Sequence, residues 1–217
     1  MKYIKWMGWG VILIALVGNS FSFASSGKIY PQPEKVIFCE TYSQQEVVSK
    51  LASDDPLFNM IQLETNDPGS SRLGSCSLSE LDKVRDYVQS ASFRSKVPDN
   101  LVILAGAEEQ GKKVRLYAIK QPDTKQPFPS KEDISAVGVD YDQPHDSYSL
   151  TITFTESAAG KWAAMTRKNI GKDIAILYGD RVISAPRVRD EIKFGKCLIS
   201  GNFTENEARK MKEILED

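Results

Sequence analysis

Histidine is almost missing from this sequence, since His145 is the single histidine among 217 residues. Hydrolases and transferases usually need a positioned nucleophile with a histidine or a paired carboxylate as its base. His145 follows Pro144 in a polar turn, and Ser184, in Ile-Ser-Ala-Pro, lacks the glycine-flanked elbow of serine hydrolases. Patterns for a P-loop or a zinc protease are also missing. We therefore predict that the protein is not an enzyme.

Cysteine is scarce as well. The three cysteines, Cys39, Cys76 and Cys197, are far apart and form no Cys-x-x-Cys pair, which argues against a zinc or thioredoxin-like site. We expect no metal and no cofactor. In an oxidising compartment one disulfide could form, and all three pairings stay open. The alternative is that the cysteines are small buried apolar residues.

An excess of charge of one sign is also lacking. The chain carries 28 Lys and Arg against 29 Asp and Glu, a net charge of -1, and has no basic tail. Such a balance gives no field that would attract nucleic acid, so nucleic acid is not an expected partner. After residue 24, no apolar run reaches the roughly 20 residues needed to cross a membrane.

The N-terminus is what departs from an ordinary globular sequence. Lys2 and Lys5 precede an apolar stretch that reaches Val17, and Ser22-Phe23-Ala24 follows. This order is typical of a secretory signal peptide, residues 1–24, cleaved after Ala24. The alternative is a retained membrane anchor over residues 6–23. In both cases we expect an exported, periplasmic protein, which meets the membrane only if this N-terminal segment is left uncleaved.

The remaining pattern predicts an α+β fold, with mostly antiparallel sheets and helices packed on one face. Leu150, Ile152 and Phe154 alternate with threonines, which is the period of a strand with one buried face. Capping boxes at Ser43, Ser77 and Thr204 predict helix starts. Strands are expected at 36–40, 100–106, 113–120, 137–142, 148–155, 174–177, 182–183 and 197–199. A helix is expected over 157–170, loops over 64–77 and 121–133, and a turn at Gly201.

A group of basic residues follows the hairpin of residues 171–188. Arg187, Arg189, Lys193 and Lys196 surround Phe194. A basic, partly aromatic surface of this kind suits an acidic or extended polypeptide segment. We therefore take Arg187, Arg189 and Phe194 as candidate polypeptide-binding residues. The alternative is a solvated loop.

The C-terminal half also resembles a known family. Its helix carries Trp162, Ala163, Thr166, Asn169, Gly171 and Lys172, its hairpin runs from Ala175 to Pro186, and Ile199 to Ala208 closes the pattern. In that order these segments resemble the head subdomain in the first periplasmic domain of the SecD and SecDF protein-export membrane proteins. Residues 54–61 and 80–106 are similar, more loosely, to the base of the Bacteroidetes-type domain. The turn departs from the family pattern, with Tyr178-Gly179-Asp180 in a shifted position.

The resemblance implies a base-like region over 35–120 and a SecDF-type head subdomain over 121–217. Nothing in the sequence resembles the family's transmembrane bundle, which couples movement to proton flow. The implied role is a non-catalytic accessory in Sec-dependent translocation, whose partners are emerging or unfolded polypeptides or Sec translocon subunits. Capture of an extended peptide, through a sheet edge or the groove between base and head, is the implied mode. The alternative is a secreted or envelope interaction module with no part in export.

Overall fold

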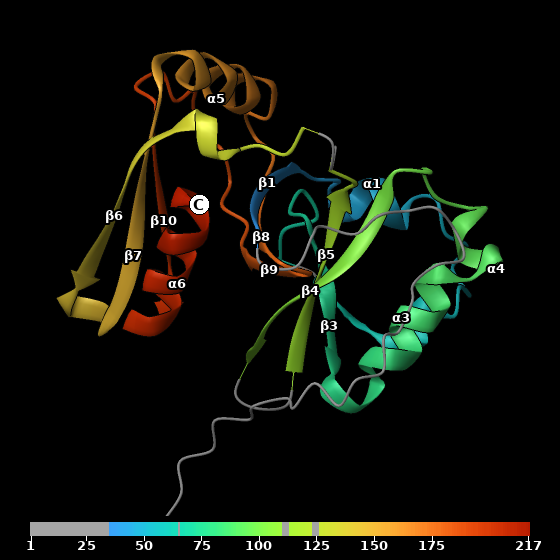
Figure 1. Cartoon of the computed structure of the whole chain (residues 1–217). Coiled ribbons are helices and arrows are strands. Elements are labelled where there is room, and N and C mark those ends of the chain that lie inside the picture. The colour runs from blue at the N-terminus through green and yellow to red at the C-terminus, as the bar shows by residue number, and fades with distance from the viewer. Residues whose placement is uncertain (1–34, 65, 110–112, 123–125) are drawn as a thin grey trace, which may run out of the picture.

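The structure, a computed structural model, describes residues 35–64, 66–109, 113–122 and 126–217. The predicted signal peptide or anchor lies outside these residues. Two sheets and their helices make up the described chain (Figure 1). Among the described residues, no helix is long and apolar enough to cross a membrane. The α+β class, with mostly antiparallel sheets, is confirmed.

The larger sheet has seven strands in the order β1-β8-β9-β4-β5-β3-β2. Neighbouring strands are antiparallel except β4 and β9, which meet in parallel at Gly106 and Val182. The predicted hairpin is β8–β9, and Gly179 at its turn has a φ of 61°. The bounds are β1 Val36–Glu40, β2 Gln62–Leu63, β3 Arg72–Ser77, β4 Leu101–Glu109, β5 Lys113–Lys120, β8 Ile174–Tyr178 and β9 Arg181–Ser184.

The chain just after β1 comes back to β5. Thr41 bridges Ile119, and the Tyr42 N–H donates to the Ala118 carbonyl at 3.0 Å. The strands β1, β8, β9, β4 and β5 therefore curl around a shared apolar interior. Its buried members are Ile37, Cys39, Leu104, Tyr117, Ile119, Ala175, Leu177 and Val182.

Helices of the first half cover the region of β3, β4 and β5 and form a separate apolar cluster. Phe93 and Leu57 are fully buried there against Leu73, Leu101 and Leu116. The helices are α1 Gln44–Val48, α2 Leu57–Met60, α3 Leu81–Gln89 and α4 Ala91–Arg94, of which α3 is seen beside β3 in Figure 1.

The smaller sheet is antiparallel, in the order β10-β7-β6. Leu150, Ile152 and Phe154 of β7 are buried, so the predicted alternation is confirmed. Helix α6, Glu205–Glu216, packs on this buried face, and α5, Glu156–Lys168, lies across one end of the sheet (Figure 1). The strands are β6 Ile134–Asp142, β7 Ser147–Phe154 and β10 Lys196–Phe203.

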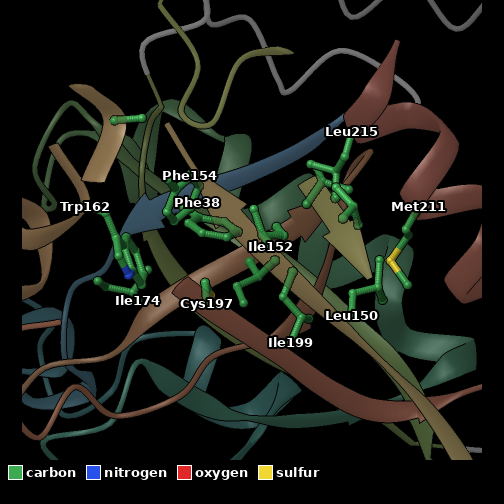
Figure 2. Packing of buried hydrophobic residues seen from close by; sticks show 14 of the residues in the cluster. Phe38, Leu150, Ile152, Phe154, Trp162, Ile174, Cys197, Ile199, Met211 and Leu215 are labelled. Carbon is green, nitrogen blue, oxygen red and sulfur yellow. The ribbon is translucent and has the colours of Figure 1, made fainter. Parts of the chain in front are cut away.

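One apolar core joins the two sheets (Figure 2). The Phe38 ring of β1 lies 5.2 Å from the Trp162 ring of α5 and 6.3 Å from the Phe154 ring of β7, centroid to centroid. Met211 and Leu215 reach the same core from α6. The elements on both sides of residue 121 are therefore packed together.

Several local expectations were wrong. Residues 64–77 contain strand β3, where the buried Leu73 packs in the first-half core. Gly201 lies inside β10 at a bulge, because the β10–β7 register shifts between Ser200 and Phe203. The Ser77 hydroxyl bonds the Glu80 carboxylate rather than capping a backbone N–H. The expected loop over 121–133 is irregular in its described residues up to 130, a 3-10 turn follows at Lys131–Asp133, and Phe128 packs against Phe38 and Trp162.

The cysteines are small buried residues, and none of the three forms a disulfide. Burial raises the pKa of the Cys39 and Cys197 thiols to about 12. Both thiols are therefore protonated near neutral pH and unreactive.

The division at residue 121 does not coincide with a boundary between sheets. β8 and β9, from the second half, pair with β1 and β4 of the first half. The assignment of 35–120 as base and 121–217 as head remains a prediction.

Candidate functional site

The predicted basic rim is divided by the structure. Arg187 turns inward, where its Nε donates to Asp173 Oδ1 at 2.7 Å and its Nη2 donates to Asp67 Oδ2 at 2.8 Å. Arg189 is exposed, and Phe194 is 90% exposed. The structure therefore leaves Arg189 and Phe194 facing solvent, while Arg187 is held in ion pairs with the buried Asp173 and the exposed Asp67.

Asp173, directly before β8, is the centre of that internal network and is only 3% exposed. Its Oδ2 accepts from the Ser71 N–H at 2.7 Å and from the Ser70 and Ser71 hydroxyls at 2.9 Å. Burial acts to raise the pKa of Asp173, but these hydrogen bonds and Arg187 outweigh it, so the pKa lies below its ordinary value. The network ties β8 to the loop before β3.

The loop that carries Phe194 is fixed on α5. The Ile192 N–H donates to the buried Thr166 hydroxyl at 3.0 Å, and Arg167 lies 3.7 Å from Glu191. The Phe154 N–H donates to the Gly195 carbonyl at 2.8 Å. An exposed phenyl ring on a fixed loop is a suitable contact for an apolar side chain of a partner.

The motif residues of α5 build the framework of this region. The Thr166 hydroxyl donates to the Trp162 carbonyl at 3.0 Å while it accepts from Ile192. Asn169, 1% exposed, donates to the Met165 carbonyl at 2.8 Å. These residues hold the loop and the helix end rather than offering free groups to a ligand.

A second candidate surface is a cleft of about 630 Å³ between the two sheets. One wall comes from β5 and the β8–β9 hairpin, the other from the end of β10 and from α6. Its lining residues are Arg115, Tyr117, Tyr178, Arg181, Val182, Ile183, Gly201, Asn202, Phe203, Glu207, Lys210 and Met211.

Two aromatic rings of the cleft lie directly on glycines. A Cβ at Gly201 would come within 2.7 Å of Phe203 Cζ, and one at Gly106 within 2.7 Å of Tyr117 Cε2. A side chain at either position would push its ring into new space, because real Cβ atoms do not approach so closely. The bulge in β10 thus lets Phe203 fold back over Gly201.

The charge of the cleft lining is mainly positive, with Arg115, Arg181 and Lys210 against Glu207. Arg181 is exposed and forms no ion pair among the described residues. Aromatic and aliphatic walls with basic groups at intervals suit an extended polypeptide with apolar and acidic side chains.

The residues of this cleft could not be found from the sequence because they come from five separate elements. β5 and β10 meet here although Tyr117 and Phe203 are far apart along the chain. In the sequence, Gly201 lies two residues before Phe203 and could have pointed to a close approach of the ring, but it was interpreted above as a turn.

The two residues considered above for catalysis, His145 and Ser184, lie in separate parts of the fold. His145 is exposed, and its Nδ1 lies 2.8 Å from Asp142 Oδ2. Ser184 ends strand β9. Within the described part of the chain, no group of three or more His, Cys, Asp or Glu residues could hold a metal ion.

Comparison with protein families gives a match to the model described as "SecDF, P1 head subdomain" over residues 105–217. The match covers more than half of the chain. The chain belongs to the SecDF P1 head family. The resemblance seen in the α5 motif, the hairpin and the closing segment is thereby confirmed.

Curated relatives of this SecDF family chain are named protein translocase subunit SecD. The protein of Sebaldella termitidis is 32% identical over 155 residues, covering 62% of this chain and 38% of that protein. The protein of Syntrophobacter fumaroxidans is 34% identical over 86 residues, covering 40% of this chain and 16% of that protein. The matches thus span less than two thirds of these relatives' own lengths.

A solved structure described as "Structure and function of a membrane component SecDF that enhances protein export" is also similar. It shares 18% identity with this chain at a TM-score of 0.39, covering 83% of this chain and 92% of that one.

Proposed function

We propose that this chain is a non-catalytic accessory in Sec-dependent protein translocation that binds emerging or unfolded polypeptide, or the translocon, in the periplasm. The observation that carries the proposal is the SecDF P1 head match over residues 105–217. Its curated relatives are named as translocase subunits, which supports the coarse role in protein transport.

The cleft between the two sheets supports the binding part of the proposal. Its aromatic walls, Tyr117, Tyr178 and Phe203, offer apolar contacts, and Arg181 offers an exposed cation at its rim that makes no ion pair within the described part of the chain. Aromatic and arginine side chains are the residues that most often dominate the energy of protein contacts. An extended segment lying between β9 and α6 would meet both kinds of group.

The surface loop supplies a second contact region. Arg189 and Phe194 remain proposed polypeptide-binding residues. Arg187 is proposed to act by holding this part of the chain in place, because its guanidinium is already bound by Asp173 and Asp67. A test of the loop therefore uses Arg189→Glu and Phe194→Ala and leaves Arg187 unchanged.

The alternative function is a secreted or envelope interaction module that kept this fold without a part in export. The same cleft and loop would then bind a different envelope protein. The two functions differ in the partner, so identifying the partner separates them.

Photo-crosslinking in living cells tests the proposal. A photoreactive phenylalanine analogue replaces Phe203 in the cleft or Phe194 on the loop, and Leu78, an exposed residue that lines neither the cleft nor the loop, serves as control. We expect crosslinks from 203 or 194, and not from 78, to exported precursors or Sec subunits identified by mass spectrometry. Crosslinks only to an unrelated envelope protein would replace the proposal with the alternative.

A further inference from the structure

The outer edge of the smaller sheet is a long strand edge without proline, lysine or a covering strand among the described residues. β6 spans nine residues, Ile134–Asp142, and pairs only with β7. Within the described residues, no backbone hydrogen bond joins residues 135–142 to any strand except β7. Alternate N–H and C=O groups of an edge strand point outward, ready to pair with another extended chain.

The other sheet edges are shortened, covered or interrupted. β2 has two residues, and on β1 the Phe38 N–H donates to the Phe128 carbonyl at 2.7 Å. β10 begins at Lys196 and is broken by the bulge before Phe203. These are devices by which proteins prevent unwanted strand pairing. β6 lacks proline and lysine, and its irregularity is confined to its first residues, between Ile134 and Ala136.

The two faces beside this edge differ in chemistry. On the face covered by α6, Val139 is half-buried and Tyr141 is 53% exposed, so apolar surface at the edge is incompletely covered. On the opposite face, Ala136, Gly138 and Asp140 are exposed. A strand placed beside β6 would set alternate side chains against these two faces.

The acidic residues of the β6–β7 hairpin are not matched by lysine or arginine within the hairpin itself, although His145 lies 2.8 Å from Asp142. The β6–β7 hairpin, residues 134–154, contains Asp140, Asp142 and Asp146 and no lysine or arginine. Opposite charges across neighbouring strands stabilise a sheet, and like charges destabilise it. The side chains that would lie beside Asp140 and Asp142 are therefore expected to be basic.

We propose that the β6 edge binds an extended polypeptide segment as a fourth strand, in which apolar side chains alternate with lysine or arginine. The apolar side chains pack beside Val139 and Tyr141, and the basic ones lie beside Asp140 and Asp142. The inference rests on the proposed polypeptide-binding function and adds a second site with an opposite charge preference to that of the cleft.

A second copy of this chain fits the edge less well than such a segment. Antiparallel pairing of two β6 strands centred on Gly138 would place Asp140 opposite Ala136 and Asp142 opposite Ile134. No cation would then meet the carboxylates, whereas a basic segment supplies one at each alternate position.

The test measures binding of labelled decapeptides to the full chain by fluorescence anisotropy. One peptide alternates lysine with valine, a second has the same composition in two blocks, and a third alternates glutamate with valine. We expect the alternating lysine peptide to bind about tenfold more tightly than either of the others, since several cross-strand pairs contribute together. Equal binding of the alternating and block lysine peptides would overturn the proposal.

The decisive variant is Asp140→Lys, with Asp86→Lys on α3 as a control that makes the same change in charge. Both aspartates are exposed, and a urea midpoint confirms that each variant folds. We expect Asp140→Lys to weaken the alternating lysine peptide about tenfold and to strengthen the glutamate peptide. An unchanged affinity in Asp140→Lys would overturn the proposal.

Amide hydrogen exchange gives the structural readout. Strand addition slows exchange at every second amide of residues 135–142, because only those amides point away from β7. Uniform slowing, or none, contradicts a fourth strand. A dimer in sedimentation whose formation protects the same amides without peptide would assign the edge to a second copy instead.

The cleft variant Arg181→Glu separates this inference from the proposed function. If Arg181→Glu weakens binding of an unfolded acidic polypeptide while Asp140→Lys leaves the lysine peptide unaffected, the edge site is wrong and the cleft proposal stands. If Asp140→Lys abolishes lysine peptide binding while Arg181→Glu changes nothing, the edge site stands and the cleft does not.

Discussion

At the scale of single residues, buried carboxylates form hydrogen bonds and ion pairs that join segments far apart in the chain. Asp173 joins β8 to the segment before β3, and Asp55, 1% exposed, accepts from the Tyr87 hydroxyl and Lys96 at 2.8 Å. The sequence placed Arg187 on a binding surface because it lies in a group of basic residues. Its true partners, Asp67 and Asp173, could not be found from sequence because the pairing depends on where distant segments meet.

The substitution Asp173→Asn should lower the free energy of unfolding by about 3 kcal/mol. It removes the buried charge that Arg187 and three hydrogen-bond donors satisfy. Urea denaturation measures the change. The matched control is Asp67→Asn, which alters the exposed side of the same arginine and should cost at most about 1 kcal/mol. Equal losses in the two variants would show that burial of Asp173 is not the source of the effect.

The stabilising effect of Asp173 should depend on pH. Since its pKa is lower in the folded state than the ordinary value near 4, the stabilisation is fully present above about pH 4. It is lost as the pH falls through the lower folded-state value. The difference in unfolding free energy between the native chain and Asp173→Asn should therefore shrink as the pH falls below about 4. A difference that stays constant from pH 6 to pH 2 would contradict this account.

At the scale of elements, local chemistry determined the helix starts at two of the three predicted capping boxes. Thr204 and Glu207 form the predicted capping box at α6, and Ser43 and Glu46 form one at α1. Ser77 has the same spacing, yet its side chain caps no backbone N–H, and a 3-10 turn over Leu78–Glu80 precedes α3. The pattern alone did not distinguish these cases because both satisfy the same spacing rule.

The substitution Thr204→Ala should destabilise the protein by about 1 kcal/mol, because the Glu207 N–H at the start of α6 loses its side-chain acceptor. Thr204→Ser should restore most of that loss. The same change at the unformed cap, Ser77→Ala, should cost only a few tenths of a kcal/mol, since no backbone N–H depends on that hydroxyl. Thermal unfolding followed by circular dichroism measures all three, and an equal cost at 77 and 204 would contradict the difference in capping.

At the scale of the whole molecule, the two sheets are joined by a shared core rather than by a linker. Phe38, from the first strand, packs with Phe154 and Trp162 of the second half (Figure 2). Phe128 covers the same group of rings from the segment that the sequence suggested as a loop. Disruption of this core should affect both sheets together.

The substitution Phe38→Ala should lower the free energy of unfolding by about 3–5 kcal/mol, the range for removing a buried aromatic ring. Because the ring contacts elements of both halves, unfolding should remain a single transition. Far- and near-ultraviolet circular dichroism in urea should give the same midpoint. The control Leu198→Ala, at a side chain 62% exposed, should change stability by less than about 0.5 kcal/mol. Two separate transitions would show that the halves unfold independently.

The sequence by itself determined the strand alternation of β7, two of the capping boxes, the hairpin turn at Gly179 and the family. The first three features depend on residues that are neighbours in the sequence, and the family is identified by the order of its motifs along the chain. Tertiary structure alone decided that Asp173 binds Arg187, that β8 lies beside β1, that the cysteines stay unpaired and that the cleft contains Tyr117 and Phe203. Each of these depends on contacts between residues far apart in the chain, which are fixed only when the apolar core closes and excludes water.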